Sequence, residues 1–137
     1  MAEITFSVMF VSGKARPRFT RTGRAYTPKA TKDAETIIRN AYKSASTTKY
    51  GEVMSAPMGT PVSVSVETNR PLPKSTPKHT TSQPDTLKPD SDNILKLVCD
   101  ALNGVAYHDD SQVTRATVQK NNRRRDISER TDVRIQF

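Results

Sequence analysis

Apolar and polar residues alternate along two segments of the chain, which is the pattern of half-buried β-strands. The first segment covers residues 3–11, and the second contains three valines separated by serines and ends before Glu67. Two further strands are predicted at about 112–120 and 131–137, near the end of the chain. The apolar residues expected to face the core in the first two strands are Ile4, Phe6, Val8, Phe10, Val62, Val64 and Val66.

Helical spacing of apolar residues begins after Thr27, which with Pro28 forms a helix-start signal. A threonine hydroxyl can cap a helix, and proline is favoured at the first helical position. The apolar stripe that follows predicts a helix over about 28–45. Residues 13–26 and 46–61 show no such period. We expect a basic loop with short extended pieces in the first of these segments, and a linker rich in Ser, Thr, Gly and Pro in the second.

A second helix is predicted over about 92–103. Ser91 or Asp92 can cap its first turn, and Asn103-Gly104 is a typical stop signal. Cys99 lies among its apolar residues and is expected to act as a small core residue. The buried face of this helix is expected to consist of Ile94, Leu95, Val98, Ala101 and Leu102.

The predicted elements follow the order β-α-β-α-β-β, which favours a layered α/β (α+β) fold with one mixed sheet and two helices packed on it. A length of 137 residues fits a single domain, 1–137. Residues 69–91 hold five of the nine prolines and no aromatic residue. We expect this segment to form a long mobile loop. Its basic residues could close over DNA, or the loop could have no role.

The composition is that of a basic protein without membrane-spanning segments. Lys and Arg outnumber Asp and Glu by 22 to 14, which gives a net charge of +8. No run approaches the ~18 apolar residues that a membrane span needs, and the acidic, alternating N-terminus does not resemble a signal peptide. The single cysteine excludes an intrachain disulfide and a cysteine-based zinc site. We therefore expect a soluble cytoplasmic protein with no membrane association, whose partner is nucleic acid.

The charge is unevenly distributed along the chain. Residues 85–110 contain six aspartates and two lysines, a net charge of −4, so the rest of the chain carries +12. Basic residues concentrate at 14–32 and 115–134. Carboxylates repel a DNA backbone. The acidic segment therefore favours phosphate binding only if a bound divalent cation makes its local charge positive. The alternative is a solvated acidic helix.

The acidic segment places carboxylates at spacings that suit a cation. Asp90 precedes the second predicted helix and Asp92 lies in its first turn, so both can converge on one ion. Lys96 and Asp100 continue the polar side of that helix, and Asp109-Asp110 lies where the next strand starts. Hard oxygen ligands suit Mg²⁺ or Mn²⁺, which can activate water on a scissile phosphate while a lysine stabilises developing charge. Alternatively, Asp92 and Asp100 only cap the helix and pair with Lys96.

Other residues have both a functional and a structural interpretation. Arg16-Pro17-Arg18-Phe19 combines two arginines and an aromatic ring on a backbone fixed by proline. Arg123-Arg124-Arg125 can hold phosphate or form a solvated turn. His108 can act as a base or a ligand because it precedes an aspartate, although a loop histidine is often neither, and the same holds for His79. There is no phosphate-binding glycine loop, nucleophile elbow or Cys/His metal pattern.

The acidic segment resembles the RusA family of Holliday-junction resolvases, which is common in phages and prophages. The matching residues read Lys88-Pro89-Asp90-x-Asp92-Asn93-x-x-Lys96-x-x-x-Asp100-Ala101-Leu102-Asn103-Gly104, followed by Asp109-Asp110-x-Gln112-Val113. Near the N-terminus, Arg16-Pro17-Arg18-Phe19 and Tyr26-Thr27-Pro28-Lys29 resemble the Gram-positive and phage branch of the family. The proline-rich stretch before Lys88 is longer than in the compact bacterial members.

The resemblance implies a homodimeric, Mg²⁺-dependent endonuclease that nicks four-way DNA junctions symmetrically. It implies metal-binding carboxylates at Asp90, Asp92 and Asp110 and an essential lysine at Lys96. Residues matched to the family or adjacent to this set, and expected to support it, are Asp109, Asp100 and Asn93. Residues expected to hold the DNA backbone are Arg16, Arg18, Arg24, Lys29 and Lys88.

Two alternatives differ from this hypothesis in their activity. A non-catalytic basic DNA-binding protein would use the aspartates only as caps and ion-pair partners, and it would cleave no junction in Mg²⁺ or Mn²⁺. A metal-dependent nuclease for flaps or other branched DNA would cut without a preference for junctions. Competition between junction, flap and linear duplex DNA separates this nuclease from a junction resolvase.

Overall fold

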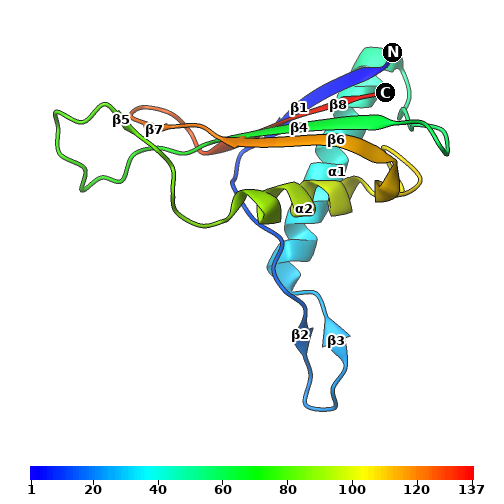
Figure 1. Cartoon of the computed structure of the whole chain (residues 1–137), viewed down its shortest axis with the longest axis horizontal. Helices are drawn as coiled ribbons and strands as arrows, with labels where there is room; N and C mark the ends of the chain where they lie inside the picture. The colour runs from blue at the N-terminus through cyan, green and yellow to red at the C-terminus, as the bar shows by residue number, and fades with distance from the viewer.

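A four-stranded mixed sheet lies at the centre of the structure, a computed structural model that describes residues 1–137 (Figure 1). Its strands are β1 (Glu3–Val8), β4 (Val62–Asn69), β6 (Val113–Lys120) and β8 (Arg130–Gln136), in the spatial order β1-β8-β4-β6. β8 runs antiparallel to β1 and β4, whereas β4 and β6 are parallel. The predicted mixed sheet is confirmed, although its first strand ends at Val8 and not at residue 11.

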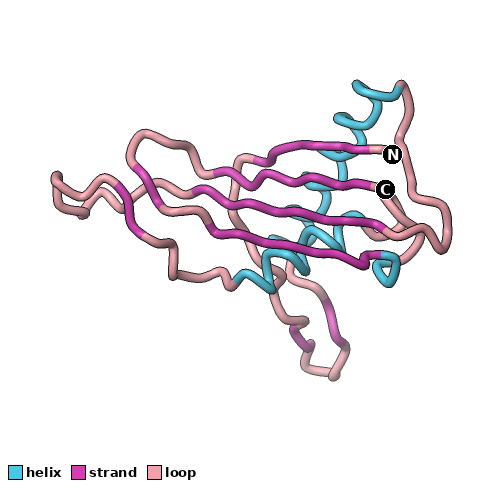
Figure 2. The backbone as a smooth tube through the Cα atoms, turned by 45° about the horizontal axis from the view of Figure 1, so that its top comes forward, coloured by secondary structure: helices cyan, strands magenta, loops and turns pink.

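The helices α1 (Lys29–Tyr50) and α2 (Ser91–Leu102) pack together and cover one face of the sheet, as predicted (Figures 1 and 2). α1 begins one residue later than expected, because Pro28 and not Thr27 is its N-cap. It also continues beyond residue 45, so residues 46–50 are helix and not linker. None of the helices has the length and apolar character needed to cross a bilayer.

The extra turns of α1 are stabilised by a buried serine. The Ser46 hydroxyl donates to the carbonyl oxygen of Glu52 at 2.8 Å and accepts from the backbone N–H of Met54 at 2.7 Å. Both hydrogen-bonding functions of the hydroxyl are therefore satisfied, and the residue can be buried on the inner side of the helix. Gly51 then ends the helix in the left-handed conformation, with φ 78°.

One core of 18 buried residues fills the space between the sheet and the helices. The alternation predicted the inward side of β1 and β4 correctly, except that Phe6 and the following Phe10 are only partly buried. On α2, Leu97 is buried although it was not predicted, and Leu95 is only partly buried where it packs against the core. Tyr42 is fully buried beside Phe6, with the ring centroids 6.2 Å apart in an edge-on arrangement.

Two small ribbons project from this body (Figures 1 and 2). One is a hairpin of β2 (Arg18–Phe19) and β3 (Ala25–Tyr26), in the segment predicted as a basic loop with extended pieces. The other pairs β5 (Ser82–Gln83) with β7 (Arg123–Arg124) at the far end of the sheet. A short 3₁₀ turn, η1 (Asp110–Gln112), precedes β6.

The proline-rich segment packs against the turn between β6 and β8. We call residues 70–88, together with residues 123–125, the proline-rich lobe. Leu72 and Asp85 are buried in it, and the backbone N–H of Leu72 donates to the carbonyl oxygen of Arg124 at 2.9 Å. The segment thus has its own buried contacts, while its mobility stays a prediction.

Candidate metal and DNA-binding site

Asp90 and Asp92 lie at the N-terminal end of α2. Asp90 is the N-cap, with an extended backbone of φ −69° and ψ 152°, and Asp92 lies in the first turn. The prediction that Ser91 or Asp92 caps the helix is therefore wrong. Both carboxylates are exposed, and neither forms an ion pair or accepts a side-chain hydrogen bond. The helix dipole stabilises negative charge here, so two free carboxylates are presented at one end of α2.

The backbone that leads to Asp90 is clamped by two basic side chains. Arg70 donates from Nη1 to the carbonyl oxygen of Lys88 at 3.0 Å, and from Nη2 to that of Leu87 at 3.2 Å. The ammonium group of Lys120 also donates to the carbonyl oxygen of Leu87. The position of Asp90 therefore depends on side chains from the start of the proline-rich lobe and from the end of β6.

The N-terminal segment packs against the other side of the same turn. A Cβ added at Gly13 would lie 2.8 Å from the Cβ of Pro89 and 3.1 Å from that of Asn93. The backbone N–H of Lys14 donates to the carbonyl oxygen of Asn93 at 2.9 Å. These residues line a shallow hollow that includes Asp90. Asn93 thus lines the same hollow as Asp90, and its side chain forms no hydrogen bond within the chain, while its supporting role stays a prediction.

Lys96 is exposed one turn after Asp92 and forms no ion pair. Asp100 pairs instead with Lys14, at 3.2 Å between Oδ2 and Nζ, and Lys14 also contacts Glu35 at 2.8 Å. Burial acts to lower the pKa of Lys14, but hydrogen bonds and attraction from Glu35 and Asp100 outweigh it and raise the pKa. The alternative in which Asp92 and Asp100 pair with Lys96 is therefore wrong, and Lys96 is free to contact a phosphate.

Asp109 and Asp110 belong to the turn that leads into β6. Asp109 caps η1, because its Oδ2 accepts from the backbone N–H of Ser111 at 3.1 Å. The side-chain oxygen of Gln112 accepts from the backbone N–H of Asp109 at 3.1 Å and completes a capping box. The hydrogen bond from Ser111 lowers the pKa of Asp109. Asp110 is exposed and accepts no side-chain hydrogen bond.

Asp110 is the first residue of η1, which lies beyond the C-terminal end of α2, whereas Asp90 and Asp92 lie at the N-terminal end (Figure 1). Burial raises the pKa of Cys99, in the last turn of α2, to about 11, and the nearby charge of Asp110 adds to this effect. A helix of 12 residues is about 18 Å long. Nowhere in the chain do three His, Cys, Asp or Glu side chains gather closely enough to hold a metal ion. One protomer therefore presents two of the three predicted ligands together and the third apart.

Neither histidine joins the carboxylates. His108 is exposed in the loop before η1, and only its backbone N–H is hydrogen-bonded, to the side chain of Gln112 at 2.8 Å. His79 is exposed in the proline-rich lobe and forms no side-chain hydrogen bond. The structure thus gives no support to a role for either imidazole as a base or a ligand.

The β2–β3 hairpin and its flanks carry unpaired basic side chains. The arginines on it are exposed, and no guanidinium group among them forms an ion pair or a hydrogen bond; they are Arg16, Arg18, Arg21 and Arg24. Lys29 is equally free at the start of α1. Four predicted DNA-binding residues therefore lie on one projection or at its base, whereas the fifth, Lys88, lies next to the carboxylate pair.

The proline-rich lobe is held together by ion pairs that the sequence pattern did not predict. Asp85, whose side chain is 1% exposed, contacts Arg70 at 2.6 Å and Arg123 at 4.0 Å. Carbonyl oxygens of the lobe accept from the guanidinium group of Arg125; they belong to Thr76, Pro77 and Thr80. Arg123 and Arg125 hydrogen-bond to carbonyl oxygens of residues 71–80 and are therefore not part of a solvated turn, whereas a phosphate contact by the arginine run stays a prediction. The one available signal was Asp85, the first acid of the 85–110 segment, which follows the basic residues Arg70, Lys74 and Lys78 in the sequence.

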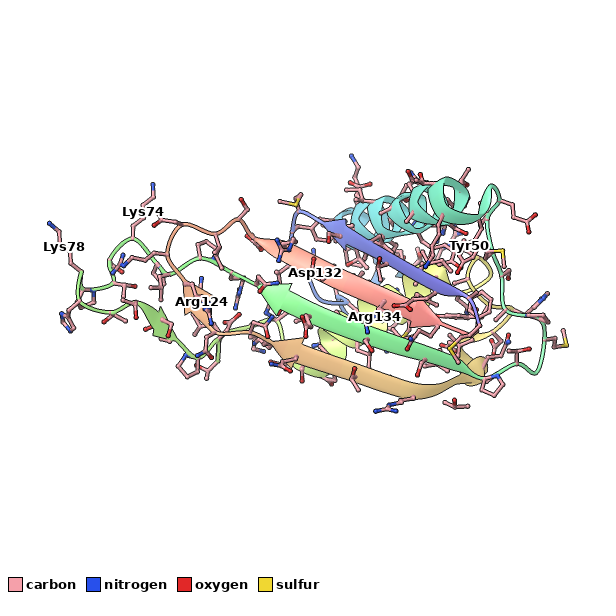
Figure 3. The ribbon with its side chains drawn as sticks, turned by 90° about the horizontal axis from the view of Figure 1, so that it is seen from above. Tyr50, Lys74, Lys78, Arg124, Asp132 and Arg134 are labelled. Atoms are coloured by element: carbon pink, nitrogen blue, oxygen red, sulfur yellow. The ribbon has the colours of Figure 1, made fainter.

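Two basic projections flank the carboxylate pair. The lobe, which leads directly into Asp90, carries the outward-pointing side chains of Lys74, Lys78 and Arg124 (Figure 3). The β2–β3 hairpin projects from the other side of the N-terminal end of α2 (Figure 1). A DNA backbone that contacts both projections would therefore pass Asp90 and Asp92.

The chain is similar to a known protein family over most of its length. The family model described as Endodeoxyribonuclease RusA matches residues 10–136. An uncharacterized protein of Bacillus subtilis (strain 168), YqaN, is 43% identical over 68 residues, which cover 44% of this chain and 48% of that protein. The chain thus spans about half the length of the curated relative that it matches.

Proposed function

The chain belongs to the RusA endodeoxyribonuclease family, and on this basis we propose that it is a structure-specific endonuclease that resolves four-way DNA junctions. The observation that carries the proposal is the pair of free carboxylates, Asp90 and Asp92, between two basic projections. The reaction would hydrolyse one phosphodiester in each of two opposing strands. Its setting would be recombination, repair or phage DNA processing in the cytoplasm.

Asp90 and Asp92 would hold Mg²⁺, for which Mn²⁺ is expected to substitute. Mg²⁺ is commonly bound by one or two carboxylates and keeps several of its waters. Two exposed aspartates with no other partner fit that requirement. When bound, the ion would supply an activated water and neutralise charge on the scissile phosphate. Arg70 would hold the backbone before Asp90 in place, so that little reorganisation is needed when the ion binds.

Basic side chains would position the DNA and stabilise charge. Lys96 is one turn from Asp92 and has no carboxylate partner, so its ammonium group can donate to a phosphate oxygen or to the leaving oxygen. Lys88, adjacent to the carboxylate pair, would hold the neighbouring phosphate. Phosphates further away would be held by the free basic residues of the hairpin and its base, which are Arg16, Arg18, Arg24 and Lys29.

A homodimer would supply the second site that paired nicks require. Asp110 gives a further reason for two protomers, since it begins η1, beyond the C-terminal end of α2, whereas Asp90 and Asp92 lie at the N-terminal end. A two-fold arrangement that places the C-terminal end of one α2 beside the N-terminal end of the other would add Asp110 to the carboxylate pair of the second protomer. That arrangement would unite the three carboxylates that no single chain brings together.

The test uses a labelled four-way junction with and without Mg²⁺. Asp90→Asn should abolish nicking while the variant still binds the junction, because the substitution removes a metal ligand and no basic group. Asp33→Asn is the matched control, since Asp33 is an exposed acid on α1 outside the site. Normal nicking by Asp90→Asn would overturn the assignment of the metal site.

The same assay separates the alternative functions. A wild-type protein that binds the junction but nicks nothing in Mg²⁺ or Mn²⁺ would be a non-catalytic DNA-binding protein. Equal cleavage of junction and flap DNA would indicate a branched-DNA nuclease without junction preference. Preferential, paired cleavage of the junction in competition with flap and duplex DNA is the result expected here.

A further inference from the structure

The β2–β3 hairpin exposes two aromatic rings. Phe19 is 70% exposed and Tyr26 is 44% exposed, and neither packs on the core. In the hairpin, Arg18 lies opposite Tyr26, and Phe19 lies opposite Ala25. Because cross-strand neighbours share a face and successive residues alternate, each face of the hairpin carries one aromatic ring.

The turn that supports these rings is fixed by hydrogen bonds. The backbone N–H of Thr20 donates to the carbonyl oxygen of Arg24 at 2.9 Å, and that of Gly23 donates to the carbonyl oxygen of Thr20 at 3.0 Å. The hydroxyl of Thr20 also accepts from the backbone N–H of Arg24 at 3.1 Å. Phe19 directly precedes this closed turn, so binding through its ring would cost little ordering of the backbone.

The charge around the rings indicates the chemistry of the partner. Single exposed aromatic residues occur on many protein surfaces, but here two of them share a projection with four unpaired arginines and no acid. Four unpaired cations gathered on one projection favour a partner with negative charge. DNA offers phosphates to guanidinium groups and flat faces of bases to aromatic rings.

We propose that the hairpin is a base-stacking arm, in which Phe19 stacks on a base exposed at the branch point of the DNA while the hairpin arginines hold the adjacent phosphates. Bases inside a continuous duplex are stacked on each other, whereas a branch point interrupts that stack. Contacts to phosphates do not distinguish a branch point from a continuous duplex, because both present the same backbone. Phe19 would therefore supply preference for branched DNA, and the arginines would supply affinity for any DNA. The inference rests on the proposed function, because it takes branched DNA as the substrate.

The test measures binding in EDTA, where no metal-dependent cleavage occurs. The probes are a four-way junction with 2-aminopurine at the branch point and a linear duplex with the same base in its interior. Phe19→Ala should weaken binding to the junction by roughly 5- to 150-fold, the range known for loss of one base–aromatic stack, and leave duplex affinity unchanged. The fluorescence change of 2-aminopurine on binding should disappear in this variant, and Phe19→Trp should preserve it.

Two controls separate stacking from other effects. Met58→Ala removes a side chain that is 79% exposed outside the hairpin, and it should change neither affinity. Arg21→Ala should weaken binding to junction and duplex equally and reduce the slope of log affinity against log salt by about one.

The inference is overturned if Phe19→Ala leaves the ratio of junction to duplex affinity unchanged, or if it changes the oligomeric state, because the ring would then belong to an interface between copies. Failure of the proposed function looks different. If the wild-type protein nicks no DNA in Mg²⁺, the proposed nuclease function is refuted. If Phe19→Ala nevertheless loses the preference for the junction over the duplex, the stacking role of Phe19 still stands.

Discussion

Arg70 holds Asp85 in a two-point ion pair at the base of the proline-rich lobe. Nη2 lies 2.6 Å from Oδ1 and Nε lies 2.9 Å from Oδ2, and the carboxylate side chain is 1% exposed. The same guanidinium group donates to the carbonyl oxygens of Leu87 and Lys88. One arginine thus joins the lobe to the backbone before Asp90, so the fold of the lobe and the position of a proposed metal ligand depend on the same contacts.

Asp85→Ala should destabilise the protein and loosen the lobe. Removing one partner of a buried ion pair leaves the other charge uncompensated, which costs about 3 kcal/mol in the free energy of unfolding. Urea denaturation measures this loss. Limited digestion with trypsin should cut the variant faster at Lys74 and Lys78, because local opening of the lobe becomes easier.

The matched control for this prediction is Glu3→Ala. Glu3 pairs with Arg134 at 3.2 Å, but their side chains are 39% and 57% exposed. Exposed pairs contribute only about 0–1 kcal/mol, so this variant should lose little stability and keep its resistance to trypsin. Equal effects of the two substitutions would contradict a special role for Asp85.

The pKa of Asp85 should make the lobe sensitive to acid. Burial acts to raise this pKa, but the hydrogen bond and the charge of Arg70 outweigh it and hold the pKa below its usual range. A carboxyl group with a lowered folded-state pKa contributes stability above its unfolded-state pKa of about 3.9, and this stability is lost as the pH falls through the folded-state pKa. The difference in unfolding free energy between wild type and Asp85→Asn should therefore shrink as the pH falls below about 4. A difference that stays constant on acidification would refute the assignment.

The elements that local pattern specifies were predicted well. Alternation identified the first two long strands and helical spacing identified both helices, because each period reports which side of an element is buried. The end of α1 was missed because Ser46 is polar in the sequence, whereas in the fold its hydroxyl is satisfied by the backbone of Glu52 and Met54. The Arg70–Asp85 contact was missed because it joins residues 15 positions apart, with no periodic signal.

In the candidate site too, the features set by local sequence were predicted, whereas those set by tertiary contacts were not. Asp90 and Asp92 could be predicted as neighbours, since both lie where one helix begins. Asp110 lies apart from them because the loop after α2 carries η1 beyond the C-terminal end of that helix. The spacing of residues in the sequence does not specify the path of this loop. The pairing of Asp100 with Lys14 depends on a contact between the N-terminal segment and α2. Tertiary contacts therefore decided which acids remain free for a cation.

Gly13→Ala should disturb the carboxylate pair by overpacking. The added Cβ would lie 2.8 Å from the Cβ of Pro89, so the segment that contains Asp90 must move. We expect a loss of about 1–3 kcal/mol in the free energy of unfolding, together with slower junction cleavage at nearly unchanged DNA affinity. Gly59→Ala is the control, because its φ of 82° makes alanine strained there while the new Cβ touches nothing. Equal loss of cleavage in both variants would show a general effect of stability.

Asp110 should complete the carboxylate pair of the other protomer, because in its own chain it belongs to η1, beyond the C-terminal end of α2. Homodimers of Asp90→Asn and of Asp110→Asn should each fail to nick a junction. When the two variants are refolded together in equal amounts, about half of the dimers contain one chain of each type. Such a mixed dimer keeps one intact site, with Asp90 from one chain and Asp110 from the other. We therefore expect Mg²⁺-dependent nicks in only one strand of each junction, measured on denaturing gels.

The control mixture combines Asp90→Asn with Asp92→Asn. These residues share one end of α2, so every site in a mixed dimer would lack a ligand and no nicking should return. If each site were contained within one chain, the mixture of Asp90→Asn and Asp110→Asn would also stay inactive, because both sites of every mixed dimer would be defective. Recovery in the first mixture alone therefore identifies a site shared between protomers, and inactivity of both mixtures contradicts it.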